Sequence, residues 1–208
     1  MLTDAQLNVF KVFCRDLLKE RTLSDVVRES GSRSMRLVQA TLERCVNEKT
    51  LRTRKIGNMT LYKVNLTSPR AQSYLQLAAP LTLSRIENVC LQELRKNLDE
   101  RVRFYSMILF GSRAARTHKD KSDLDVFILV DDYEKRKTVE RIANPINTPT
   151  AIELHVVAMT VDDFIASVKA DERSVVTEIL AKHLAYHNVA PFCSLLSREV
   201  GRGLPAPA

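Results

Sequence analysis

Residues 111–125 read Gly-Ser-Arg-Ala-Ala-Arg-Thr-His-Lys-Asp-Lys-Ser-Asp-Leu-Asp, and this stretch decides the fold of the second part of the chain. It follows an apolar run at residues 105–110 and leads into another at residues 124–130. Short apolar runs of this length, bounded by small and polar residues, predict two strands joined by a loop.

The loop opens with Gly111-Ser112 and closes with two carboxylates, Asp123 and Asp125. Side chains two apart in a strand share a face, so both carboxylates should point the same way. Mg²⁺ prefers oxygen ligands and usually takes one or two carboxylates plus substrate phosphates. A glycine lets backbone N–H groups approach phosphate oxygens closely. The stretch therefore predicts a site for a nucleoside triphosphate and its metals, and the alternative is a β-hairpin-like loop with solvated acids.

This pattern resembles the nucleotidyltransferases of the DNA polymerase β-like superfamily, in particular the small "minimal" ones. Their signature is an apolar strand, Gly-Ser or Gly-Gly, about ten variable residues, and then Asp-h-Asp-h, where h is apolar. Here eleven residues separate Gly111 from Asp123. The chain departs from the pattern at Ala115-Arg116, where the family has a glycine after Ser-x-Ala-Arg.

The resemblance implies a mixed α/β (α+β) domain over residues 81–200, with a mixed sheet and C-terminal helices. Its implied activity is Mg²⁺-dependent transfer of a nucleoside monophosphate from a nucleoside triphosphate to a hydroxyl of a protein or RNA. The family also needs a third acid on a later strand, and Glu153 in the β-branched run 150–158 is the candidate. The implied catalytic residues, which hold two Mg²⁺ ions, are Asp123, Asp125 and Glu153, and the implied nucleotide-binding residues are Gly111, Ser112, Arg113 and Arg116.

Three of these assignments have plainer alternatives. Glu153 reads as a mid-strand acid, which is costly unless it is paired or metal-bound, and the plainer alternative is an edge-strand or surface glutamate. Arg113 and Arg116 either neutralise the leaving pyrophosphate or are exposed loop arginines. His155 shares a face with Glu153, but a lone strand histidine is more often packed or solvated, and we leave it outside the catalytic set.

Composition indicates the number of domains and the compartment to expect. The chain has 208 residues, of which 45% are hydrophobic, and this suits one or two globular domains. No apolar run is long enough for a membrane span, and the N-terminus lacks the basic and apolar regions of a signal peptide. The four cysteines are far apart, which predicts buried thiols in a reducing compartment and a cytoplasmic protein.

The net charge of +7 is confined to the first part of the chain. Residues 1–90 hold 15 Lys and Arg residues against 8 Asp and Glu residues, whereas residues 91–208 hold 17 of each. A basic segment beside a neutral one suggests that the first part meets a polyanion, although a solvated basic surface is the plainer explanation of charge alone.

The order of elements in the basic part favours the polyanion. Helical spacing predicts helices over residues 2–18, 22–31 and 34–47, and two extended runs around Gly57-Asn58 predict a hairpin. Three helices followed by a basic hairpin resemble a winged helix-turn-helix domain, which we place at residues 1–80.

The resemblance implies that the third helix enters the major groove of double-stranded DNA and that the hairpin follows the backbone. Winged helices also serve as protein-docking modules, so this alternative stays open. The residues implied in DNA binding are Arg33, Arg36, Gln39, Arg44, Arg52, Arg54 and Lys55.

Three functional classes follow for the whole chain. The first is an enzyme that nucleotidylates a partner protein or RNA, and the second is a DNA-binding transcriptional regulator that senses nucleotide without turnover. The third is an antitoxin-like protein that masks a partner and represses its own promoter. A homodimer is compatible with each class, and residues 201–208, with two prolines, predict a frayed tail.

Overall fold

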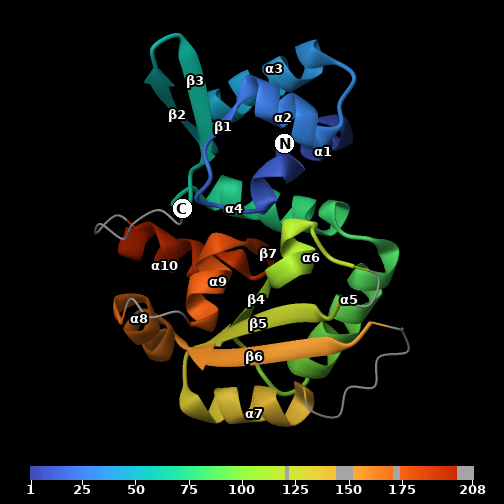
Figure 1. Ribbon diagram of the computed structural model, residues 1–208, viewed down its shortest axis with the longest axis vertical. Coiled ribbons are helices and arrows are strands. Elements are labelled where there is room, and N and C mark those ends of the chain that lie inside the picture. The colour runs from blue at the N-terminus through green and yellow to red at the C-terminus, as the bar shows by residue number, and fades with distance from the viewer. Residues whose placement is uncertain (120–121, 144–151, 171–173, 201–208) are drawn as a thin grey trace.

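The computed structural model describes residues 1–119, 122–143, 152–170 and 174–200. Figure 1 shows two stacked parts, with small helices and a hairpin above and a four-stranded sheet with its helices below. Buried apolar side chains of both parts form one connected core. Within the described ranges, no helix is long and apolar enough to cross a membrane. The predicted tail at 201–208 lies outside the described residues.

The first helix is shorter than the sequence predicts. Helix α1 spans Asp4–Phe10 and begins with a reciprocal cap between Thr3 and Gln6. A 3₁₀ turn, η1 (Lys11–Cys14), follows it, and the helical pattern then stops. The predicted helix over residues 2–18 is therefore wrong beyond residue 14. The backbone leaves the helix there because Asp16 bonds to a strand of the lower sheet.

The remaining predicted elements of the upper part are confirmed. Helix α2 starts at a capping box between Thr22 and Asp25 and ends at Gly31, whose φ of 67° is left-handed. The three strands pair antiparallel in the order β1-β3-β2. The bounds are β1 Arg21–Thr22, α2 Leu23–Ser30, α3 Met35–Asn47, β2 Leu51–Ile56 and β3 Met59–Val64.

Three helical segments lead from the hairpin to the lower sheet. Helix α4 has Ser68 as its N-cap and a proline at its first position, and α5 opens with a capping box between Ser84 and Glu87. Both starts follow from sequence, because Ser caps and an early Pro satisfy or remove the orphan N–H groups of a helix. The bounds are α4 Pro69–Ala78, η2 Ala79–Thr82 and α5 Arg85–Asp99.

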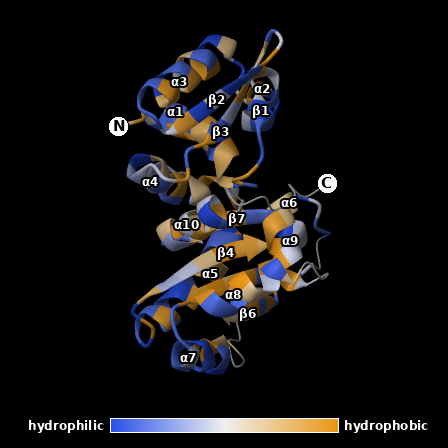
Figure 2. Ribbon diagram, turned by 90° about the vertical axis from the view of Figure 1, so that its left-hand side faces the viewer, coloured by the Kyte–Doolittle hydropathy of each residue, from blue (hydrophilic) through white to orange (hydrophobic). Residues whose placement is uncertain are grey.

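The lower sheet has the strand order β6-β5-β4-β7. The pairs β4–β5 and β4–β7 are antiparallel, and β5–β6 is parallel, so the sheet is mixed as predicted. Figure 2 shows that the strands carry mainly hydrophobic residues and that α7 is mainly hydrophilic. The bounds are β4 Tyr105–Phe110, α6 Gly111–Ala115, β5 Leu124–Val130, α7 Tyr133–Ala143, β6 Leu154–Thr160, α8 Val161–Lys169, α9 Val175–Ala181, β7 His183–His187 and α10 Val189–Val200.

The two parts are joined by more than the connecting chain. Arg15 forms a β-bridge with Leu184, and the Asp16 N–H donates to the His183 carbonyl at 2.9 Å. The Leu17 N–H donates to Nε2 of the buried His183 side chain at 2.9 Å. Residues 15–17 therefore extend the edge of the lower sheet, and the predicted division near residue 80 runs through a shared core.

The four cysteines are buried and outside any disulfide, as the sequence predicts. Burial raises the pKa of Cys193 to about 12, and a thiol with such a pKa stays protonated and unreactive.

Candidate active site

Strand β4 ends at Phe110, and α6 begins at the next residue, Gly111. Gly111 has a φ of 71°, which is the left-handed region that favours glycine. A Cβ at this position would collide with Oδ2 of Asp125, closer than real atoms approach. The glycine therefore makes room for the Asp125 carboxylate at the start of α6, where the half-buried Ser112 is the next residue.

The two aspartates lie at the start of β5 and share a face, as the sequence predicts. Asp123 directly precedes the strand and is exposed, and the side chain of Asp125 is 24% exposed. The alternating residues Leu124 and Val126 are fully buried. This alternation places both carboxylates on one face of the sheet, at the N-terminal end of β5.

Glu153 lies at the same end of the sheet, but its environment differs from the one that the sequence predicts. It directly precedes β6 and is exposed, so it is not a mid-strand acid buried between apolar residues. Its carbonyl accepts the Leu124 N–H at 2.8 Å, and the parallel register pairs Asp125 with His155. Glu153 is therefore level with Asp123 on the neighbouring strand.

His155 is the site residue that sequence reasoning missed. Its Nδ1 lies 3.1 Å from Oδ1 of Asp125, although its side chain is 60% exposed. The available signal was its period-two spacing from Glu153, and the sequence could not show which residue of β5 lies opposite. The contact fixes one oxygen of Asp125, while the other faces Gly111.

The acidic side chains are of the type that binds a divalent cation, but their present positions do not form a complete metal site. Carboxylate oxygens are the ligands that Mg²⁺ prefers. Within the described ranges, however, no three His, Cys, Asp or Glu side chains lie together closely enough to hold a metal ion. The implied three-carboxylate site thus consists of Asp125 on β5 and two exposed acids, Asp123 and Glu153, which directly precede β5 and β6.

Arg113 has a structural role that the nucleotide-binding prediction did not include. Its side chain is 5% exposed, and its guanidinium forms an ion pair with the buried Glu87 at 3.2 Å. It also donates from Nε to the carbonyls of Ser122, at 2.9 Å, and Asp123, at 3.1 Å. Burial alone would raise the pKa of Glu87, but hydrogen bonds from Ser84 and Arg113 outweigh it and leave the pKa lowered. Arg113 therefore holds the backbone that carries the first aspartate.

Arg116 ends α6 in a left-handed conformation with a φ of 58°. This is the position at which the family pattern has glycine, and the conformation explains why glycine suits it. The Arg116 side chain is directed toward η2, where Nη2 donates to the Thr82 carbonyl at 3.3 Å.

The residues predicted to bind DNA differ in whether their side chains already have partners within the protein. Arg44 is engaged within the protein through Glu48, Gln6 and the Met1 carbonyl, so the prediction that it faces DNA conflicts with its contacts. Three others are exposed but have partners: Gln39 with Glu43, Arg52 with Thr67, and Arg54 with Glu20. The remaining three, Arg33, Arg36 and Lys55, are exposed on α3, its approach and the hairpin.

A family model described as "Polymerase beta, Nucleotidyltransferase" matches residues 92–178, which is less than half of the chain. The matched segment runs from within α5 to within α9 and contains the Gly-Ser start of α6, both aspartates and Glu153. The match supports a polymerase β-like nucleotidyltransferase domain here and nucleotidyl transfer as the general chemistry. Searches of curated proteins and of solved structures found no match.

Proposed function

We propose that the chain transfers a nucleoside monophosphate from a nucleoside triphosphate to a hydroxyl of a protein or RNA, with Mg²⁺ held by Asp123 and Asp125. The observation that carries this proposal is the packing of Gly111 against Asp125 within the segment that matches the family model. Asp125 lies against Gly111 at the start of α6. A metal ion bound to this carboxylate would therefore hold a triphosphate close to the backbone N–H groups of the helix start.

Each residue has a defined part in the proposed reaction. Gly111 and Ser112 contact the β- and γ-phosphates, and His155 orients the Asp125 carboxylate. When bound, divalent ions supply charge stabilisation for the attacking and leaving oxygens of an in-line displacement. The exposed Glu153, level with Asp123 on the neighbouring strand, accepts the proton of the acceptor hydroxyl, whose oxygen bonds to the α-phosphorus as the bond to pyrophosphate breaks.

The test is incorporation of label from each of the four α-labelled nucleoside triphosphates, with Mg²⁺ and a cell lysate as the source of acceptor. We expect label on one class of macromolecule and its loss in the Asp123→Asn, Asp125→Asn double variant. Asp131→Asn is the matched control, because Asp131 lies just past the other end of β5, where it pairs with Lys135. Unchanged labelling in the double variant would disprove the assignment.

Glu153→Gln separates chemistry from binding. A group that acts on the attacking hydroxyl contributes mainly in the transition state, so its loss should lower kcat and leave the nucleotide Kd close to that of the wild type. Incorporation at the wild-type rate would mean that another group, with His155 as the nearest, accepts the proton.

We propose double-stranded DNA as the partner of the upper part, which we regard as a winged helix-turn-helix domain. The supporting observation is that the whole charge excess lies in residues 1–90, while Arg33, Arg36 and Lys55 are exposed. Phosphate contacts release counterions, so the affinity of the full chain for duplex DNA should fall steeply between two salt concentrations. Arg36→Gln should weaken binding, and Arg44→Gln should not do so beyond its effect on folding.

The second candidate function is a transcriptional regulator, antitoxin-like or not, whose lower part binds nucleotide or a partner without turnover. The arginine in place of the family's glycine at position 116 favours it. DNA binding together with a Mg²⁺-dependent nucleotide Kd, and no incorporation into any acceptor, would select this function over the enzyme.

A further inference from the structure

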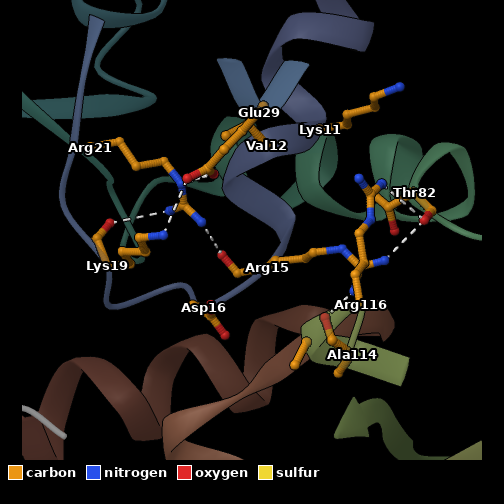
Figure 3. A pocket seen from close by; sticks show the side chains of 11 residues that line it. Lys11, Val12, Arg15, Asp16, Lys19, Arg21, Glu29, Thr82, Ala114 and Arg116 are labelled. Atoms are coloured by element: carbon orange, nitrogen blue, oxygen red, sulfur yellow. Dashed lines mark hydrogen bonds and ion pairs between the residues drawn. The ribbon is translucent and has the colours of Figure 1, made fainter. Parts of the chain in front are cut away.

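A pocket of about 250 Å³ lies where the upper part meets the end of α6 (Figure 3). Its walls come from η1 and the segment after it on one side, and from η2 and α6 on the other. Asp123, Asp125, Glu153 and His155 do not line it, so it is separate from the proposed active site. Its cationic lining residues are Lys11, Arg15, Lys19, Arg21 and Arg116.

The acidic lining residues do not balance these cations. Glu29 is already shared between Lys19 and Arg21, at 3.2 and 2.8 Å. Arg15 and Arg116 form no ion pair with a carboxylate of the described chain. Their guanidinium groups instead donate to the same carbonyl, that of Thr82, at 2.9 and 3.3 Å. Two like charges therefore meet in the pocket and donate to neutral carbonyls, and among the described residues Asp16 is the one lining carboxylate besides Glu29.

Arg15 is the more constrained of the two arginines. It also donates to the carbonyls of Arg113 and Ala114, which ties the pocket to α6. Its Nε is buried and has no hydrogen-bond partner in the part of the chain that the structure describes. Burial, followed by the charge of Arg116, lowers the pKa of Arg15 to about 10. An anion in the pocket would offset both effects.

Backbone strain gathers at the same place. Among the described residues, four non-glycine residues have positive φ, and two of them, Asp16 at 49° and Arg116 at 58°, line this pocket. Such conformations cost roughly 1–3 kcal/mol each and persist where the surroundings hold them, often at ligand sites. At position 116 a glycine would adopt the backbone without cost, so the arginine side chain has a use that offsets its strain.

We propose that this pocket binds a phosphate-class oxyanion between the guanidinium groups of Arg15 and Arg116. The volume is below the roughly 300–1,000 Å³ typical of sites for larger organic ligands, so it fits a free phosphate or pyrophosphate, or the phosphate end of a nucleotide. Guanidinium forks suit phosphate oxygens in geometry and charge. Because one wall belongs to each part of the molecule, the bound anion clamps the upper part to α6.

The test uses the full chain in EDTA, so that metal-dependent nucleotide binding does not contribute. Phosphate, pyrophosphate and AMP are titrated calorimetrically and by melting temperature, with ionic strength matched by chloride. We expect at least one of them to bind and to raise Tm above the chloride baseline. Tighter binding of AMP than of phosphate identifies a nucleotide as the source, and tighter binding of phosphate or pyrophosphate identifies the free anion.

Variants make the outcome decisive. Arg116→Gly suits the left-handed backbone, so it should fold and should bind the anion at least tenfold more weakly. Arg103→Gln, an exposed arginine away from the pocket, should bind as the wild type does. The Asp123→Asn, Asp125→Asn variant should keep the anion site even though it loses transfer. No Tm shift above chloride, or equal binding by Arg116→Gly and the wild type, would overturn the proposal without touching the proposed active site.

Discussion

Gly111 and Arg116 mark the beginning and the end of α6, and both have backbone φ angles in the left-handed region. The same local geometry has opposite explanations at the two positions. At Gly111 a neighbouring carboxylate leaves no space for a side chain, whereas at Arg116 a side chain is present despite the strain.

We expect Gly111→Ala to lower the rate of nucleotide transfer about 100-fold, because the added Cβ would push Asp125 out of position. Gly57→Ala is the matched control. Gly57 has a similar φ of 55°, but a Cβ there would meet nothing within 4 Å, so the variant has a strain of about 1–2 kcal/mol without a collision. The measurements are labelled-nucleotide incorporation and urea unfolding of both variants. Equal activity in the two variants would show that the approach to Asp125 is unimportant.

Arg116→Gly should raise the free energy of unfolding of the anion-free protein by up to about 1 kcal/mol, because it removes the left-handed strain. Ala115→Gly, one residue earlier and in helical conformation, should lower it by roughly 0.5–1 kcal/mol. Urea unfolding in chloride buffer measures both. A loss of stability in Arg116→Gly would mean that the bond to the Thr82 carbonyl outweighs the strain.

At the scale of elements, a buried ion pair fixes the loop between α6 and β5. Arg113 joins Glu87 at the start of α5 to the backbone of Ser122 and Asp123. Breaking a buried pair by removing one partner leaves an uncompensated charge and typically costs about 3–5 kcal/mol. The pair therefore links the stability of α5 to the position of the first aspartate.

Arg113→Gln should lower the free energy of unfolding by about 3 kcal/mol and lower kcat more than it raises KM, because it acts on Asp123 through the loop. Arg95→Gln removes an exposed pair with Asp99 and should cost less than about 1 kcal/mol. Denaturant unfolding and incorporation kinetics test both variants. If Arg113→Gln instead raised only KM, the arginine would be a nucleotide contact after all.

Local signals predicted the elements, and long-range pairing could not be predicted. Caps such as Thr22 with Asp25 and Ser84 with Glu87 are three residues apart, so their residue types alone locate the helix starts. The contact of Asp125 with His155 depends on the register of two strands, and the pair of Glu87 with Arg113 depends on tertiary packing. The sequence thus predicted that the two aspartates share a face, but not the contact of one of them with His155 or the buried ion pair of Arg113.

At the scale of the whole molecule, His183 connects the two parts through a neutral imidazole. Its Nδ1 donates to the Ile179 carbonyl at 2.9 Å, and its Nε2 accepts the Leu17 N–H. Burial lowers the pKa of this side chain below its ordinary value of 6.5. Protonation would set an N–H against the Leu17 N–H at the junction.

The sign of the pH dependence follows from that lowered pKa. Below about pH 6.5 the unfolded chain binds a proton that the folded chain does not, so stability is full above about pH 6.5 and falls as pH decreases, by at most about 1.4 kcal/mol per pH unit. Denaturant unfolding at about pH 7.5, 6.5 and 5.5 measures this. His183→Gln should flatten the decrease, whereas His155→Gln, which is exposed, should not. Identical slopes in the wild type and His183→Gln would contradict this account.

The bond between Asp16 and His183 also has a consequence for synthesis on the ribosome. These residues are 167 positions apart, and ordering so distant a pair must precede any gain from the contact. A chain emerges at about 5–20 residues per second, so residues 15–17 wait roughly 10 to 30 seconds for their strand. During that interval the upper helices lack one side of their support, and a chaperone that covers the segment after α1 would protect the nascent chain until β7 is made.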